Sequence, residues 1–176
     1  DIAVDFRGRV SKGMAKWTAA EMDEYDPMFY EEPLLPEHAD SLPDIAAHSK
    51  TPLASGERLY SRWEFGHILD ERLVDIVQPD PSHAGGISET KKIANTAEAA
   101  DIQVALHCPL GPIAFATCVQ LDTAVHNTIA QAQNLDIHAP ADNEHLAYLE
   151  DPDVFGFEDG YVTAPDAPGL GIEIDE

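Results

Sequence analysis

Residues 2–6 read Ile-Ala-Val-Asp-Phe, a short apolar run that closes on the carboxylate of Asp5 and precedes a helical pattern over Ser11–Asp23. Glu31 and Glu57 close the next two apolar runs, each 26 residues after the carboxylate before it. Parallel strands joined by crossover helices repeat at about this interval. The sequence therefore predicts an α/β fold in which three carboxylates meet at the carboxyl end of one sheet.

The alternation of apolar runs and amphipathic stretches continues along the chain. Predicted strands cover Ile2–Phe6, Met28–Tyr30, Pro52–Ser55, Asp75–Gln78, Gln103–Leu106 and, with a weaker pattern, Asn127–Gln131; predicted helices cover Ser11–Asp23, Ala39–His48, Ser61–Glu71, Ser88–Ala100 and Pro112–Val125. This order fits either a doubly wound sheet or part of a (β/α)₈ barrel. The glycine-rich motifs that bind nucleotides on open sheets are missing, and polar residues after each strand favour the barrel.

The three carboxylates also predict a metal site. Carboxylates brought close together repel one another unless a cation lies between them, and hard divalent cations prefer oxygen ligands. We therefore expect Asp5, Glu31 and Glu57 to bind Mg²⁺.

The next two strand ends carry an acid and a histidine. Asp80 and His107 lie 27 residues apart, so they are expected on neighbouring strand ends. An isolated pair of this kind is more often structural, but its position after three carboxylates in register favours catalysis. A carboxylate that orients an imidazole makes a general base, and a nearby metal supplies the electrophile that removal of a proton alpha to a carboxylate requires.

The composition limits partners and compartment. A formal net charge of −23, from 33 acidic and 10 basic residues, argues against nucleic-acid and anionic-membrane partners. We read the dispersed acidic surface as adaptation to high salt, the alternative being an acidic mesophilic protein. No apolar run approaches the roughly 20 residues of a membrane span. Cys108 and Cys118 form no CxxC pair and are expected as ordinary thiols in a reducing cytoplasm.

Five motifs carry a resemblance to a known family. They are Phe29-Tyr30-Glu31-Glu32-Pro33, Gly56-Glu57-Arg58, Asp75-Ile76-Val77-Gln78-Pro79-Asp80, His83-Ala84-Gly85-Gly86-Ile87 and Leu106-His107-Cys108-Pro109-Leu110-Gly111-Pro112. Together they resemble the enolase superfamily and, within it, the mandelate racemase subgroup. The likeness is greatest to the galactonate dehydratases and related sugar-acid dehydratases, and it runs over nearly the whole chain.

The resemblance implies a residue-by-residue mechanism. Asp5, Glu31 and Glu57 match the Mg²⁺ ligands of the family. His107 matches the base that removes the C2 proton of an aldonate, and Asp80 matches its partner. Mg²⁺ then stabilises the enediolate, and loss of the 3-hydroxyl gives a 2-keto-3-deoxy acid.

The resemblance also implies a domain organisation. The family fold is a modified (β/α)₇β barrel with an N-terminal capping domain. Residues 1–136 are expected to form a partial barrel from its third strand onward, and residues 137–176 a tail that packs on the capping domain. That capping domain and the first two strands are then absent from this chain. A small-molecule sugar acid and further copies of the same protein are the implied partners.

Two positions depart from the family pattern. Galactonate dehydratases usually carry Asp-x-His at the third strand, with the histidine protonating the leaving hydroxyl, whereas this chain has Arg7 at that position. Ala132 replaces a Glu on the eighth strand. A guanidinium is a poor proton donor at neutral pH but binds carboxylate or hydroxyl groups well. Arg7 is therefore predicted as a catalytic residue beside His107 and Asp80, and the acid is left to water, a metal-bound group or His107. Among substrates of the galactonate, gluconate or xylonate type, the change at Arg7 favours one other than galactonate.

Three further residues are expected near the site. Arg58 and His83 are predicted to bind substrate, the alternatives being structural support and loop structure. Glu32 should face away from Glu31 and either pair with a cation or lie behind the metal ligands. The competing functions are a racemase or epimerase, which needs a second base, and a non-catalytic sugar-acid binder or incomplete piece.

Overall fold

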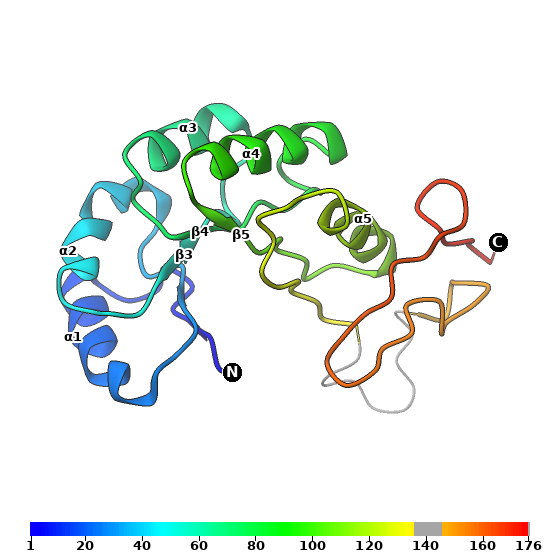
Figure 1. Ribbon diagram of the computed structural model, residues 1–176. Helices are drawn as coiled ribbons and strands as arrows, with labels where there is room; N and C mark the ends of the chain where they lie inside the picture. The colour runs from blue at the N-terminus through cyan, green and yellow to red at the C-terminus, as the bar shows by residue number, and fades with distance from the viewer. Residues whose placement is uncertain (136–145, 176) are drawn as a thin grey trace.

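One parallel sheet with helices on its outer side forms the centre of the molecule. The computed structural model describes residues 1–135 and 146–175. The strands are β1 (Val4–Asp5), β2 (Tyr30–Glu31), β3 (Leu53–Ser55), β4 (Ile76–Val77) and β5 (Gln103–Val104); the helices are α1 (Lys12–Met22), α2 (Leu42–Ala46), α3 (Arg62–Asp70), α4 (Ile87–Ala99) and α5 (Pro112–Asp122). Figure 1 shows the helices as an arc outside the strands.

The strand order distinguishes the two predicted architectures. The sheet runs β1-β2-β3-β4-β5, each strand parallel to the next one in the chain, with Asp5 opposite Glu31. A doubly wound sheet reverses its order at a switch point, whereas a barrel adds each new strand on the same side. A parallel bridge between Val104 and Thr128 continues the sequence at the position of the weak sixth strand. The α/β prediction and the barrel-like winding are confirmed.

The core lies between the sheet and the helices. Its largest fully buried side chains include Tyr30, Phe65, Ile93 and Phe115, from β2, α3, α4 and α5. Strands covered on both faces need apolar residues throughout, and β4 is buried at both positions. The buried polar residues Glu32, Ser55, Glu57, Gln78 and Asp80 lie at strand ends or in the loops that follow them.

The predicted helix Ala39–His48 is wrong in its first part. The chain forms a 3₁₀ segment over Pro36–Ser41, with a non-helical backbone at His38, and only then α2. A helix begun at Ala39 would bring the ring of Pro43 against the carbonyl of Ala39. With α2 beginning at Leu42, Pro43 lies in the first turn, where no intrahelical N–H is needed.

The C-terminal segment packs on α5. Phe155 meets Phe115 edge to face at 4.9 Å, and Phe157 stacks on the same ring at 5.6 Å. The side-chain amide of Gln120 donates to the carbonyl of Pro165 at 2.7 Å. The segment thus packs on a helix of the same chain, and its contact with a capping domain stays a prediction. The predicted boundary at 136/137 lies outside the described residues.

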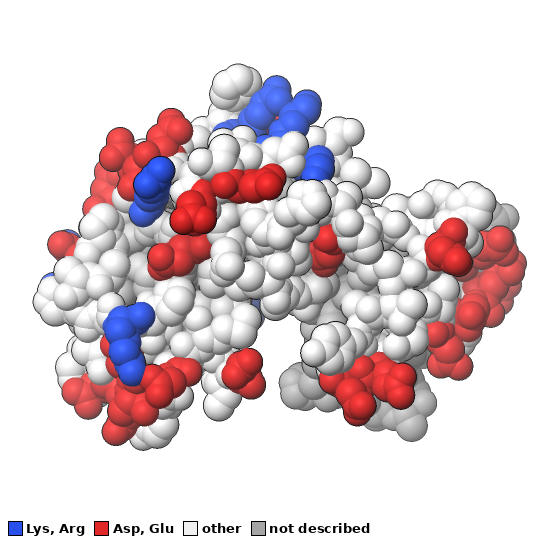
Figure 2. Space-filling model, viewed as in Figure 1, with Lys and Arg blue, Asp and Glu red and all other residues white. Residues whose placement is uncertain are grey.

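The surface is acidic over both the helical arc and the C-terminal segment, as Figure 2 shows for one face. Acidic side chains form several separate groups on this face rather than one tail. Cys108 and Cys118 are buried and free. Among the helices of residues 1–135 and 146–175, none combines the length and apolar character that crossing a bilayer requires.

Candidate active site

Three acidic side chains follow neighbouring strands at one end of the sheet. Asp5 and Glu31 end β1 and β2 in register, and Glu57 lies two residues beyond β3. Burial raises the pKa of Glu31; the side-chain amide of Gln78 lowers it through a 2.9 Å hydrogen bond, and the carboxylates of Asp5 and Glu57 raise it further. The sheet therefore brings the three predicted ligands within electrostatic reach of one another.

Each carboxylate is paired with a protein group. Asp5 accepts from the backbone N–H of Arg7 at 2.7 Å, and the Arg7 Nε lies 3.2 Å from its other oxygen. Glu31 accepts from Gln78, and Glu57 pairs with His107 and Arg58. Among the described residues, no three His, Cys, Asp or Glu side chains stand close enough together to hold a metal ion in this arrangement.

The chemistry of these donors nevertheless suits a hard cation. All three offer carboxylate oxygens, which Mg²⁺ prefers. Oε2 of Glu57 is buried, and Nε2 of His107 lies 3.0 Å from it without a well-aligned hydrogen bond. The like charges of Asp5 and Glu57 act on Glu31, and a bound cation relieves such repulsion. The residues present fit a magnesium ion in donor type and location.

The predicted acid and histidine form a hydrogen-bonded pair. Nδ1 of His107 lies 3.0 Å from Oδ2 of Asp80, whose side chain is almost fully buried. The other Asp80 oxygen accepts from the backbone N–H of Ser82 at 2.7 Å. Burial alone would raise the pKa of Asp80, but the bonds from His107 and Ser82 outweigh it and lower the pKa. Asp80 is thus an ionised carboxylate that fixes the orientation of the imidazole.

The second nitrogen of His107 faces the carboxylate cluster. Nε2 lies 3.0 Å from Oε2 of Glu57. Burial works to lower the pKa of His107, but Asp80 and Glu57 outweigh it and raise the pKa to about 9. The histidine therefore joins the predicted dyad to one of the predicted metal ligands.

The remaining predicted residues lie around this centre. His83 has its Nδ1 3.3 Å from the Glu57 carbonyl and 3.9 Å from Asp80. Arg58 contacts Glu57, and its guanidinium also binds the buried Glu32. The pairing of Glu32 with a cation is confirmed. No bound molecule tests whether Arg58 and His83 contact substrate, so that role stays a prediction.

Sequence reasoning did not single out Gln78. Its amide donates to Glu31, and its own Oε1 is buried without a hydrogen-bond partner among the described residues. The available signal was its position as the last residue of a predicted strand, in register with the other strand-end polar groups.

A cavity of about 610 Å³ flanks the dyad rather than containing it. It lies between the loops after β4 and β5, with Ser82, Gly86, Leu110 and Tyr148 among its lining residues. None of the three carboxylates lines this cavity, so the chemistry of the site is assigned from the strand ends.

Comparisons with known proteins agree with this arrangement. A D-galactonate dehydratase of Variovorax paradoxus is 47% identical over 176 residues, which is 100% of this chain and 46% of the relative. An enolase from Agrobacterium radiobacter, solved with sodium and L-malate, has a TM-score of 0.86 and 36% identity over 99% of this chain and 47% of its own. A mandelate racemase/muconate lactonizing enzyme from Sulfitobacter has a TM-score of 0.85 and 32% identity, over 96% of this chain and 40% of its own.

The chain spans about half the length of the relatives it matches. The family described as enolase C-terminal domain-like matches residues 1–176. With that match, the parallel sheet and the strand-end carboxylates, the chain belongs to the enolase C-terminal domain-like family.

Proposed function

We propose that the full-length protein is a sugar-acid dehydratase that removes water from an aldonate. The observation that carries the proposal is the Asp80–His107 pair, whose second ring nitrogen lies against Glu57, one of three carboxylates at one end of a parallel sheet. A protein that only binds sugar acids has no use for a histidine oriented as a base. The relative from Variovorax paradoxus, called a D-galactonate dehydratase, supports the same reaction class.

His107 would accept the C2 proton at Nε2. Asp80 holds Nδ1, which leaves Nε2 as the only ring atom open to a substrate. Since Nε2 now pairs with Glu57, that contact has to break before the histidine can act as a base. The electron pair of the C–H bond moves toward the substrate carboxylate, and departure of the 3-hydroxyl completes the elimination.

The protonated His107 would serve as the acid for the departing hydroxyl. It carries the abstracted proton, and Asp80 stabilises its positive charge. Arg7 lies with its guanidinium on Asp5, where it can bind a hydroxyl or carboxylate but is a poor proton donor.

Asp5, Glu31 and Glu57 are the residues that would hold Mg²⁺. When bound, the ion supplies positive charge for the substrate carboxylate, on which negative charge grows as the C2 proton leaves. The relative from Agrobacterium radiobacter was solved with sodium and a dicarboxylic acid, which supports a site for a cation and a hydroxy acid in this family.

The substrate is proposed to be an aldonate of the galactonate, gluconate or xylonate type. The 47% identity to a D-galactonate dehydratase supports the class, while Arg7 in place of the expected histidine favours a different stereochemistry or length. Turnover of galactonate, gluconate and xylonate, measured under the same conditions, identifies the preferred substrate. A clear preference for galactonate would contradict the argument from Arg7.

The proposal is tested with the full-length protein and its His107→Asn variant. Each is incubated with Mg²⁺ and one aldonate at a time, and the 2-keto-3-deoxy product is measured as its semicarbazone. We expect product from at least one aldonate and a loss of about 10²–10⁴-fold in the variant. His67→Asn on α3, an exposed histidine paired with Asp40, is the matched control and should keep full activity. Product formation at the wild-type rate without His107, or no product from any aldonate, would contradict the proposal.

A further inference from the structure

Arg58 contacts three loops that follow three successive strands. Its Nη2 donates to the carbonyl of Arg7 at 2.7 Å, in the loop after β1. Its Nε lies 3.3 Å from Glu32 Oε2, after β2, and 3.3 Å from Glu57 Oε1, after β3. A single guanidinium thus joins the backbone segments that carry the three proposed metal ligands.

Glu32 anchors this arrangement from the interior. Its side chain is fully buried, and Oε1 accepts from the Ser55 hydroxyl at 2.6 Å and from the backbone N–H of Gly56 at 2.9 Å. Its own carbonyl accepts from the N–H of Gly8 at 2.7 Å. Among the residues that the structure describes, the other carboxylate oxygen, Oε2, has no hydrogen-bond donor and is compensated by Arg58.

The energetics of such a pair indicate a role beyond stability. Glu32 is fully buried while the Arg58 side chain is 35% exposed, so the carboxylate carries most of the desolvation cost. Replacing a buried ion pair with apolar residues is often neutral or stabilising. The pair also holds backbone that is conformationally restricted, since Arg7 and Glu32 both have positive φ, at 54° and 43°. We infer that the Glu32–Arg58 pair fixes the relative positions of the loops after β1, β2 and β3.

That geometry concerns the three carboxylates directly. Glu31 precedes Glu32, Glu57 precedes Arg58, and Asp5 lies two residues before Arg7. The side chains of the Glu32–Arg58 pair therefore make their hydrogen bonds and ion pairs within two residues of a proposed ligand. A shift of the guanidinium would move the loops of all three.

We propose that Glu32 and Arg58 are positioning residues that set the spacing of Asp5, Glu31 and Glu57 for metal binding. The inference rests on the proposed function, because it assigns to the same three carboxylates the role of metal ligands. It replaces substrate binding as the main role of Arg58, whose Nε and Nη2 are engaged by protein groups.

Arg58→Lys separates charge from geometry. Lysine keeps the positive charge but has no planar group able to reach the Arg7 carbonyl, Glu32 and Glu57 together. In the full-length protein, binding of Mn²⁺ in place of Mg²⁺ is followed by electron paramagnetic resonance without substrate. We expect the Kd for Mn²⁺ to rise about 10–100-fold, and the aldonate KM at saturating metal to change much less.

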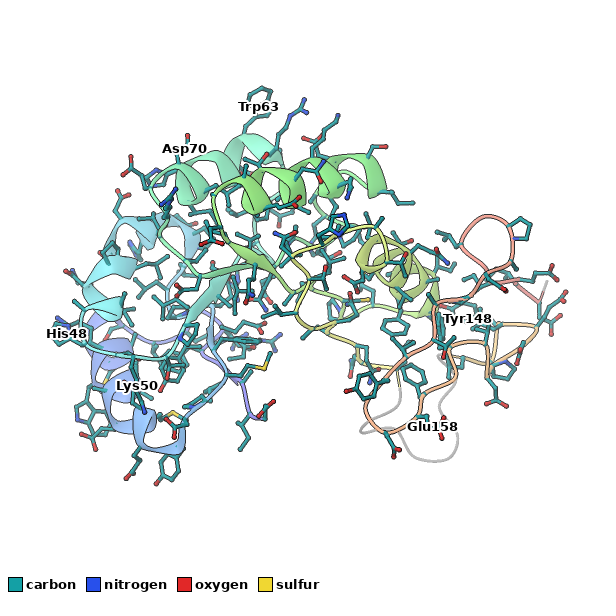
Figure 3. All side chains as sticks on the ribbon, in the orientation of Figure 1. His48, Lys50, Trp63, Asp70, Tyr148 and Glu158 are labelled. Atoms are coloured by element: carbon teal, nitrogen blue, oxygen red, sulfur yellow. The ribbon has the colours of Figure 1, made fainter. Side chains whose placement is uncertain are left out.

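Arg62→Lys is the matched control. Arg62 is the first residue of α3, pairs with Glu89 at 3.2 Å and lies over the ring of Trp63, which projects outward from the helix (Figure 3). The same substitution there should leave the Mn²⁺ affinity unchanged. If Arg58→Lys fails to fold, Glu32→Gln provides the test, because glutamine keeps an acceptor for Ser55 and Gly56 and removes only the charge that Arg58 meets.

The outcomes distinguish this inference from the proposed function. A wild-type protein that binds no Mn²⁺, or binds it unchanged after Asp5→Asn, would overturn both. A wild-type protein that binds Mn²⁺, with Kd unchanged in Arg58→Lys or in Glu32→Gln, would overturn the positioning role alone. If Arg58→Lys raises the KM for the aldonate and leaves the Mn²⁺ affinity unchanged, Arg58 binds substrate and the positioning role is overturned.

Discussion

His107 has a different carboxylate at each ring nitrogen, and this decides its protonation. Asp80 at Nδ1 and Glu57 at Nε2 together raise its pKa to about 9 against the opposing effect of burial. The contact with Asp80 is compatible with catalysis, because it leaves Nε2 for the substrate. In the proposed reaction the contact with Glu57 would compete with substrate, so the pKa of His107 during turnover would depend on how Glu57 is engaged.

Asp80→Asn should change the pH dependence of turnover as well as its rate. Loss of the carboxylate removes a cause that raises the pKa of His107, so the neutral base forms at lower pH. The ascending limb of kcat/KM should move to lower pH, while the maximum falls by about 10²–10⁴-fold because the imidazole is no longer oriented. Initial rates from pH 5 to 10 measure both effects.

The exposed Asp70 at the end of α3 is the control for this variant (Figure 3). Asp70→Asn should leave both the limb and the maximum in place. A limb that keeps its position in Asp80→Asn would show that Asp80 does not govern the charge of His107.

At the scale of elements, much of the fold could be predicted because the chain is strongly periodic. All five strands lie within or next to their predicted ranges, and the interval of 26 residues correctly placed three carboxylates at one sheet edge. For Glu32 the sequence predicted two alternatives, an ion pair with a cation or a position behind the metal ligands, and it did not identify Arg58 as the partner. The contact of Arg58 with three loops depends on positive φ angles at Arg7 and Glu32. The spacing of apolar and polar residues along the sequence does not predict such backbone angles.

The turn after β3 gives a stability prediction. Gly56 has φ +141°, and a Cβ there would come within 2.8 Å of the Phe65 ring and 3.0 Å of the Gln78 backbone nitrogen. Gly56→Ala should lower the free energy of unfolding by about 1–3 kcal/mol through backbone strain alone, measured by urea denaturation. Gly66 within α3 has open space around it, so Gly66→Ala should stabilise by about 0.5–1 kcal/mol. A Gly56→Ala variant as stable as wild type would contradict the packing of this turn.

The C-terminal end of α5 gives a pH prediction. Burial raises the pKa of Asp122 to about 7, although Thr128 works to lower it. The folded state therefore keeps this proton up to about pH 7, whereas the unfolded state releases it near the usual value of about 4. Stability is lost as the pH rises between these values, because the folded state binds more protons.

Asp122→Asn should remove the loss of folding stability that accompanies the rise in pH. The gain in Tm over wild type should be small at pH 4 and grow toward pH 8, where it corresponds to about 1–3 kcal/mol for a buried group freed of an uncompensated charge. Thermal melts of the full-length protein at several pH values measure it. A gain independent of pH would mean that Asp122 is not protonated in the folded state.

At the scale of the whole molecule, charge dominates. A net charge of −23 spread over the surface makes the compact state repel itself. Salt shortens the range of that repulsion from about 10 Å at 0.1 M to about 3 Å at 1 M. We propose that the protein is adapted to high salt, and this adaptation belongs to the surface rather than to the site.

The salt prediction is a Tm that rises with KCl concentration from about 0.1 M to beyond 1 M. Chloride is used because strongly excluded anions such as sulfate stabilise proteins by a different route. Sucrose, which is excluded but does not screen charge, serves as the comparison and should give a smaller rise. A Tm that is flat or falls with KCl would contradict adaptation to high salt.

We propose that His107 removes the C2 proton of an aldonate beside a carboxylate-held cation. The most direct test of this proposal is proton NMR of the full-length protein with Mg²⁺ and each aldonate in D₂O at high salt. We predict a 2-keto-3-deoxy product from one aldonate, with the wild type active and His107→Asn inactive. Absence of both product and deuterium exchange at C2, for every aldonate, would contradict the claim.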